Sequence, residues 1–409
     1  MTYLRSSLAL TAAAALFACA PSSQSTPAEP AGGADAALLP DGSTQAIPGQ
    51  PEPPRGPPPW SMAGGKKLVT VMTRNLYLGA DINKVMNPPA IPGVPGEVAL
   101  AVTADALWET VQANDFPSRA RALAAEIAAI RPDLVALQEA SLYRLGPGLA
   151  CQGHLVPPEE VALDYLAILT AELAARGTPY RVAAQVENFD GTLCALKLDP
   201  ATGQPVRALD VRLTDRDVVL VRGDLPVRDA RAANYVARAT FSVPGVTGLD
   251  ITIPRGWASA EVKVRGEWLR FVGTHLEEEV GPLGIVQMAQ AEELAALLAH
   301  EPLPVILAGD FNAFPGGPTT SHALLRAAGF HDAWELLRSE DPGPTCCFAE
   351  DLRSGALETR IDLVWLRGGL LPWSIARTGA TALTPAGLHP SDHAGVAARA
   401  LLLDPRFER

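Results

Sequence analysis

The chain has 409 residues, of which 48% are hydrophobic and 19% charged, so a sizeable core is expected and a fibrous or disordered chain is excluded. Its 33 lysines and arginines against 45 aspartates and glutamates leave a net charge of −12. Because neutralising phosphates takes clustered basic side chains, this balance argues against nucleic-acid binding through a basic surface alone. An acidic protein can still act on a phosphate ester if a bound divalent cation supplies the positive charge.

The first eighteen residues have the features of a secretory signal. Arg5 supplies positive charge, and Leu8–Phe17 is an apolar segment too short for a membrane span. It leads into Leu16–Cys19 (LFAC), which resembles a bacterial lipobox. We therefore predict a signal peptide at 1–18 and a lipid anchor on Cys19, which would place the protein in the cell envelope, on the periplasmic or the outer surface. Ordinary cleavage at a nearby alanine, which would give a secreted protein, is the alternative.

Residues 19–66 are predicted to form a disordered tether. Eleven of the 37 prolines lie between Pro21 and Pro59, among Gly, Ser, Ala and Gln. Such a segment buries too little apolar surface to offset the entropy lost on ordering, and proline-rich runs stay extended. The folded domain is therefore predicted at 67–409.

Patterns of apolar residues in this domain predict alternating strands and helices. Strands are expected at Leu68–Asn75, Leu134–Leu137, Val218–Val221, Ala260–Val264, Trp268–Val272, Val305–Ala308, Ile361–Leu366 and Gly395–Ala398. Helices are expected at Ser118–Ile130, Glu159–Arg176 and Val286–His300, and loops at Met86–Val98 and Asp341–Cys347. The fold class is therefore α/β.

Four cysteines remain if Cys19 is acylated: Cys151, Cys194, Cys346 and Cys347. An even number in an exported chain favours disulfides and predicts no free thiol. The spacing leaves all three pairings open, including a bridge between the adjacent Cys346 and Cys347. A zinc site is disfavoured because no second Cys or His pair lies at ligand spacing.

Acids, amides and histidines occur where the predicted strands end. They are Asn75, Glu139, His275, Asp310, Asn312, Asp362, Asp392 and His393. Any one of them alone is explained by a cap or a turn. Because ligands of α/β proteins bind where strand ends converge, we predict that together they form one site.

The segments around these residues resemble the endonuclease/exonuclease/phosphatase superfamily, the deoxyribonuclease I-like proteins. The matching segments are TRNL at 73–76, LQE at 137–139, GTHL at 273–276, GDFNA at 309–313, RIDL at 360–363 and SDH at 391–393. The resemblance covers about Lys67 to Leu402. It implies a four-layer α/β sandwich, in which two mixed β-sheets pack face to face with helices outside.

The resemblance also implies a metal site. Glu139 is expected to be the principal ligand of a divalent cation, Mg²⁺ or Mn²⁺, with Asp392 as a second or outer ligand and the Asn75 amide in the same cluster. Hard cations of this kind take carboxylate and amide oxygens, and they offset the charge of a phosphoryl group.

Five further residues are implied as catalytic. Asp310 positions or deprotonates the attacking water, and Asn312 binds a phosphate oxygen. His393 contacts the phosphate, oriented by Asp362, which favours the protonated ring. His275 corresponds to a second histidine that nucleases of this group use as an acid or phosphate donor. Either Asp310 or His393 can serve as the base.

Other polar residues have structural explanations. Arg212, Asp215, Arg216 and Asp217 are read as a solvated strand edge, and Glu277–Glu279 as an exposed acidic loop. Trp257 is expected to pack against its own loop, and Gln287 and Gln290 have no assigned role.

The sequence therefore predicts a metal-dependent phosphoesterase, in particular a phosphodiesterase that hydrolyses nucleic acid by in-line attack of water. The first alternative is a sphingomyelinase- or inositol-phosphatase-like hydrolase of lipid or inositol phosphates. The second is a catalytically silent binding protein, which the intact motifs disfavour. No protein partner is implied, and a monomer is expected.

Overall fold

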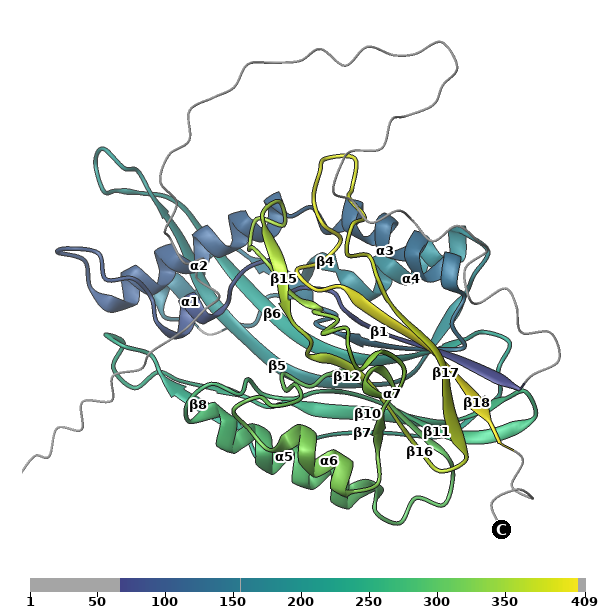
Figure 1. The fold of residues 1–409 in the computed structure, drawn as a ribbon. Helices are drawn as coiled ribbons and strands as arrows, with labels where there is room; N and C mark the ends of the chain where they lie inside the picture. Colours follow the sequence, from purple (N-terminus) through teal and green to yellow (C-terminus); the bar gives the residue numbers. More distant parts are fainter. Residues whose placement is uncertain (1–66, 155, 404–409) are drawn as a thin grey trace, which may run out of the picture. The chain divides into compact units, whose positions relative to one another are not determined.

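The computed structural model describes residues 67–154 and 156–403, which form the α/β unit in Figure 1. The predicted signal peptide at 1–18, Cys19 and the predicted tether at 19–66 lie outside the described residues. Within the described ranges, no helix is long and apolar enough to cross a membrane.

The larger main sheet has eight strands and is mixed, because β1 runs parallel to β2 and antiparallel to β18. β6 pairs with β2 through its C-terminal part and with β3 through its N-terminal part, and β5 pairs with β6 along almost its whole length. In spatial order the strands are β17 (Leu370–Thr378), β18 (Gly395–Leu402), β1 (Leu68–Asn75), β2 (Leu134–Gln138), β6 (Pro205–Arg222), β3 (Leu142–Gly146) and β4 (Glu160–Asp164), with β5 (Tyr180–Leu198) beside β6.

The second main sheet has six strands, with a parallel pair, β11 and β12, among antiparallel neighbours. In spatial order they are β13 (His331–Asp332), β16 (Asp362–Arg367), β12 (Val305–Asp310), β11 (Glu267–His275), β10 (Gly256–Val264) and β7 (Val227–Asn234). Two short hairpins lie outside both sheets: β8 (Ala239–Ser242) with β9 (Asp250–Ile253), and β14 (Cys346–Phe348) with β15 (Gly355–Thr359).

Helices cover the outer face of each sheet (Figure 1). The helices that cover these faces are α2 (Gly96–Ala113), α3 (Phe116–Ile130), α4 (Tyr165–Ala175), α5 (Leu283–Leu298) and α6 (Ser321–Ala327). The short helix α1 (Asn83–Met86) has no buried residue, and α7 (Ala333–Arg338) packs Ala333 and Trp334 into the core between the two sheets. A 3₁₀ turn lies at Ala150–Gln152. Buried apolar residues of α2, α3 and α4 cluster with the eight-stranded sheet, and those of α5 and α6 cluster with the six-stranded sheet.

The central core lies between the two sheets. Val69 and Val71 of β1 face the second sheet, whereas Met72 packs beneath the helices. Ile306 and Ala308 of β12 likewise face the first sheet. Because successive strand residues point to opposite faces, one apolar strand contributes to two apolar layers. The result is the expected order of helix, sheet, sheet and helix.

Three predicted elements are wrong in part. The loop expected at Asp341–Cys347 ends early, since Cys346 and Cys347 belong to β14. The helix expected at Glu159–Arg176 begins only at Tyr165, because the residues before it form β4 and pair with β3. Asp164 then caps α4 by accepting a hydrogen bond from the Ala167 amide (3.2 Å). The loop expected at Met86–Val98 ends early, since α2 begins at Gly96.

The four cysteines among the described residues form two disulfides. Cys151 pairs with Cys194 and ties the 3₁₀ turn to β5, and Cys346 pairs with the adjacent Cys347. This selects one of the three pairings that the spacing left open.

Candidate active site

Three of the predicted site residues lie side by side in the six-stranded sheet. His275 ends β11 and is in register with Asp310, the last residue of β12. Asp310 is in turn opposite Asp362, the first residue of β16. Parallel strands bring their carboxyl ends to one edge of a sheet, and an antiparallel neighbour begins at that edge. The sheet itself therefore groups these side chains.

The eight-stranded sheet contributes Asn75 and Glu139 at the same edge. Asn75 ends β1 in register with Gln138, so Glu139 follows directly at the end of β2. The Asn75 Nδ2 donates to Glu139 Oε1 (3.0 Å) and also to Asp310 Oδ2 (3.1 Å). One amide group therefore links the predicted metal ligand to the predicted base across the two sheets.

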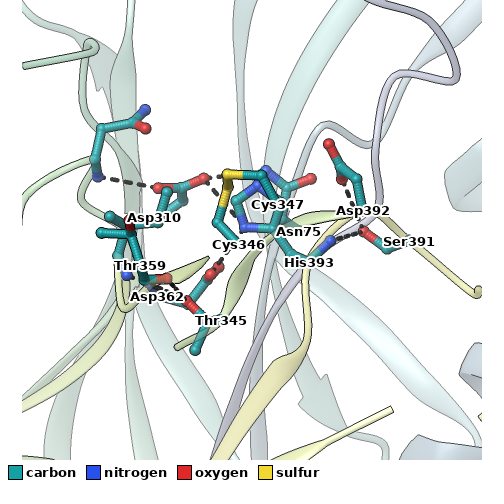
Figure 2. The surroundings of a disulfide bond; sticks show 12 residues. Asn75, Asp310, Thr345, Cys346, Cys347, Thr359, Asp362, Ser391, Asp392 and His393 are labelled. Atoms are coloured by element: carbon teal, nitrogen blue, oxygen red, sulfur yellow. Dashed lines mark hydrogen bonds and ion pairs between the residues drawn. A yellow bond between two sulfur atoms is a disulfide. The ribbon is translucent and has the colours of Figure 1, made fainter. Parts of the chain in front are cut away.

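Asp362 and His393 form a buried pair (Figure 2). His393 Nδ1 lies 2.8 Å from Asp362 Oδ2 and 3.8 Å from Asp310 Oδ2. Burial alone would lower the pKa of the imidazole, but the negative charges of Asp362, Asp392 and Asp310 raise it well above the usual histidine value. His393 is therefore a cation at neutral pH, with Nδ1 engaged by Asp362.

Both carboxylate oxygens of Asp310 are held. Oδ1 accepts from the Asn312 backbone amide (3.0 Å), and Oδ2 accepts from Asn75. Burial and the nearby charge of Asp362 raise the pKa of Asp310 to about 7. A carboxylate with such a pKa is suited to accepting a proton near neutral pH.

His275 differs from His393 in its charge. Burial, together with the charges of Arg255 and His393, holds the pKa of His275 well below the usual value, so its ring is neutral. Arg255 Nη1 lies 3.1 Å from His275 Nδ1, and Asn312 Nδ2 lies 3.3 Å from Nε2. The site thus contains one cationic and one neutral histidine, whose nearest ring nitrogens lie 3.8 Å and 3.7 Å from Asp310 Oδ2.

Two of the site residues have left-handed backbone conformations, with φ of 58° at Glu139 and 47° at Asn312. Non-glycine residues rarely adopt this region, and such strain concentrates at functional sites. At Glu139 the turn lets Oε2 accept from the Leu78 amide (2.6 Å). At Asn312 it lets the backbone amide return to Asp310.

Glu139 and Asp392 fit a divalent cation. Desolvation, then the charges of Asp392 and Asp215, raises the pKa of Glu139 to about 8, and burial also raises the pKa of Asp392. Acids that repel one another in this way favour an added cation, and their oxygens are the donors that Mg²⁺ and Mn²⁺ take. Asn75 directs its oxygen to the Tyr77 amide (2.8 Å).

Asp310, Asp362 and His393 are also potential metal ligands, since their donor atoms lie within 4.8 Å of one another. His393 Nδ1 and Asp362 Oδ2 are already hydrogen-bonded to each other, and the imidazole is cationic. A metal ion here would have to displace that bond, so Glu139 and Asp392 are the better match.

Several buried residues beside the site were misread from the sequence. Asp215 and Asp217 are not a solvated edge, being 4% and 1% exposed, and Glu277 is 3% exposed rather than part of an open loop. Arg255 is their shared counter-charge: it lies 3.4 Å from Glu277 and contributes to the electrostatics of both aspartates. Asp217 also lies 3.9 Å from His275.

Two glutamines that had no assigned role hold the loops after β11 and β12. Gln287 Nε2 donates to the carbonyls of Glu277 (2.9 Å) and Asn312 (2.6 Å). Gln290 Oε1 accepts from the Glu277 amide (2.8 Å). In the sequence, this role was indicated only by two glutamines on one face of a predicted helix that follows the GTHL segment. Trp257 does not pack against its own loop as expected: it lies in β10 and packs against the apolar cluster under α5.

Several solved structures are similar to this chain. One is D. rerio TDP2 complexed with a single-strand DNA product, which is 17% identical, with a TM-score of 0.47 over 81% of this chain and 98% of that one. Another is the mannosyl-6-phosphatase Bt3783 of Bacteroides thetaiotaomicron, also 17% identical, with a TM-score of 0.47 over 81% and 99%. No curated protein matches the chain.

The sequence profile of the Endonuclease/Exonuclease/phosphatase family matches residues 107–393, which is more than half of the chain. The matched range runs from α2 to His393 and includes every predicted site residue except Asn75. Members of the family hydrolyse phosphoester bonds. The chain therefore belongs to the endonuclease/exonuclease/phosphatase family of phosphoester hydrolases.

Proposed function

We propose that the protein is a metal-dependent phosphodiesterase in which Asp310 activates water for in-line attack on phosphorus. The supporting observation is the single cluster in which Asp310 Oδ2 accepts from Asn75 and lies 3.8 Å from His393 Nδ1. In-line displacement needs a base, positive charge around the phosphoryl oxygens and fixed geometry, and this cluster can supply all three.

Asp310 takes the proton from water in this scheme. Its two oxygens are oriented by Asn75 and by the Asn312 amide, so the remaining lone pairs have a fixed direction. With a pKa near 7 it is partly ionised at neutral pH and strong enough to accept a proton as the oxygen–phosphorus bond forms.

His393 stabilises the charge that develops on the phosphoryl group. Because Nδ1 is held by Asp362, Nε2–H is the donor available to the substrate. His275, which is neutral, can donate to a second phosphate oxygen or to the leaving oxygen, with the Arg255 cation beside it.

Glu139 and Asp392 would hold the divalent cation, with Asn75 in the same cluster. When bound, the cation polarises a phosphoryl oxygen and offsets the negative charge of the leaving group.

For the substrate we propose nucleic acid, on the resemblance of His275 to the second histidine of nucleases in this group.

A lipid or inositol headgroup phosphate is the second candidate, and an acidic rim beside the site supports it. Burial and the charges of Glu277 and Asp81 raise the pKa of Glu278. The Asp81 amide donates to Oε1 of Glu350 (3.0 Å), whose other oxygen pairs with Lys84. Such a rim repels a long polyanion and tolerates a headgroup that carries a cation.

The test is hydrolysis of DNA, RNA, sphingomyelin and inositol phosphates by the purified full chain, with Mg²⁺ or Mn²⁺ and with a chelator. Bis-p-nitrophenyl phosphate and p-nitrophenyl phosphate separate diester from monoester hydrolysis. We expect diester hydrolysis that the chelator abolishes and that Asp310→Asn lowers by about 10² to 10⁴. Activity that persists in the chelator, or that Asp310→Asn leaves unchanged, would contradict the mechanism.

We also propose that the catalytic domain, residues 67–409, works in the cell envelope behind a tether at 19–66 and a lipid on Cys19. This rests on the signal-like segment and lipobox alone. Metabolic labelling with a fatty acid, compared between the wild type and Cys19→Ala, tests it. Equal labelling of both chains would refute the anchor and leave a secreted protein.

A further inference from the structure

The segment Thr345–Phe348 lies between the two parts of the chain that carry Asp362 and His393 (Figure 2). On one side, Cys346 forms an antiparallel bridge with His393, and the Ala394 amide donates to the Thr345 carbonyl (2.7 Å). The Phe348 amide donates to the carbonyl of Asp392 (2.8 Å). The backbone around His393 is thus paired to this segment over three residues.

The same segment also holds the start of β16. Thr345 Oγ1 accepts from the amides of Ile361 and Asp362, each at 3.1 Å. The Thr345 amide donates to the Thr359 carbonyl (2.8 Å), and Cys346 is in register with Thr359. Because Thr345 and Cys346 are buried, water does not compete for these hydrogen bonds. One short segment therefore sets the relative position of Asp362 and His393.

Cys346 and Cys347 in this segment are joined by a disulfide. The bond closes a ring of the two residues and so limits the torsions available to the dipeptide that pairs with His393. Cys346 is buried, whereas Cys347 is partly exposed. Exposed disulfides are the ones that reductants reach most readily. The other disulfide, Cys151–Cys194, ties the turn before β4 to β5 and pairs with none of the site segments.

We propose that the Cys346–Cys347 disulfide is a positioning element for the Asp362–His393 pair, and that its reduction switches the proposed phosphodiesterase to a slow form. A dithiol reductant breaks the S–S bond: two electrons and two protons pass to the two sulfurs, giving two thiols, and the reductant becomes a disulfide. The opened dipeptide then samples more conformations, and His393 loses its fixed position relative to Asp362. Exchange with a low-molecular-weight disulfide, which takes up the two electrons and two protons and becomes two thiols, restores the ring.

The experiment uses the full chain carrying Cys151→Ala and Cys194→Ala, together with Cys19→Ser, so that the vicinal pair is the one remaining disulfide. Activity is measured before reduction, after dithiothreitol in Mg²⁺ buffer, and after re-oxidation, and mass spectrometry counts the labelled thiols. A matched chain with Cys346→Ser and Cys347→Ser as well shows what reductant does without the bond.

On reduction we expect kcat to fall by roughly 10- to 100-fold, the cost of a misplaced catalytic group, with KM changed much less. Re-oxidation should restore kcat, and the matched chain should be slow in both conditions. Equal kcat for the oxidised and reduced forms would overturn the proposal. So would loss of near-ultraviolet circular dichroism on reduction, because the bond would then stabilise the fold rather than position two residues.

If a cysteine variant does not fold, selective reduction of the wild type with thiol mapping gives the same comparison. The inference rests on the proposed function, but the two fail differently. An oxidised chain with no diesterase activity contradicts the proposed function, whereas an active chain that is insensitive to reduction contradicts only the role of the disulfide.

Discussion

Asp362→Asn tests the division of roles in the site most directly. The substitution keeps the size of the side chain and a polar contact with His393 Nδ1, 2.8 Å from Asp362 in the wild type, but removes the negative charge. Asp362 raises the pKa of His393 and also that of Asp310. Without its charge both pKa values should fall.

Both limbs of the pH–rate profile should move in the same direction. His393 must be protonated, so the alkaline limb moves to lower pH when its pKa falls. Asp310 must be ionised, so the acid limb also moves to lower pH. The bell-shaped profile should therefore shift as a whole to lower pH, with little change in its width.

The size of the effect follows from the charge that is removed. Opposite charges about 4 Å apart attract by about 4 kcal/mol at an effective dielectric constant near 20. Asp392 and Asp310 remain beside His393 and retain part of that attraction. We therefore expect kcat at pH 8 to fall by roughly 10- to 100-fold, and kcat near pH 5.5 to change by a much smaller factor.

The assay is a pair of pH–rate curves at saturating metal, with metal titrations of the same proteins. Asp392→Asn is the matched control: it lies next to the same histidine but is proposed as a metal ligand, so it should weaken metal binding more than it moves the profile. If Asp362→Asn instead left the profile in place and raised the metal requirement, Asp362 would be a ligand and the assignment of roles would be wrong.

Three further predictions can be checked on the same protein. Glu139→Gln should weaken divalent-metal binding and lower activity by about 10² or more, and unchanged metal affinity in calorimetric titration would remove Glu139 from the site. Thiol labelling of the denatured, unreduced chain should detect no free thiol among Cys151, Cys194, Cys346 and Cys347; stoichiometric labelling of any one would contradict the disulfides. Because the pKa values of Glu139 and Asp310 are raised to about 8 and about 7, the folded metal-free chain binds protons more tightly than the unfolded chain, and its stability should fall as the pH rises from about 4 to about 8. Thermal unfolding in chelator should show a lower Tm at pH 8 than at pH 5, and Mg²⁺ should reverse most of the loss; a Tm that rises with pH would contradict the raised pKa values.

The amino-acid sequence was enough to predict the fold class and the grouping of the site residues. Buried strands such as Leu68–Asn75 and Val305–Asp310 end in polar residues, and parallel pairing brings such ends to a common edge. The prediction therefore depends on local patterns and on one topological rule. The face-to-face packing of the two sheets, which the family resemblance implied, then brings Asn75 and Asp310 together although 235 residues separate them.

Burial of charged residues was decided by the tertiary structure. Asp215 and Asp217 alternate with polar neighbours along β6, a pattern that also fits an exposed edge. Pairing of that strand with β5, and the approach of Arg255 from the other sheet, turns them into buried acids beside His275. No local signal marks such a contact, because both partners come from elements distant in the sequence.

Cysteine pairing was likewise beyond the sequence. Four cysteines allow three connectivities, and their spacing favours none. The choice follows from two long-range contacts: β5 passes the turn that carries Cys151, and the segment around Cys346 is held between Thr359 and His393. Local sequence thus determined which residues end the strands. Long-range strand pairing decided which residues form ion pairs, hydrogen bonds and disulfides with one another.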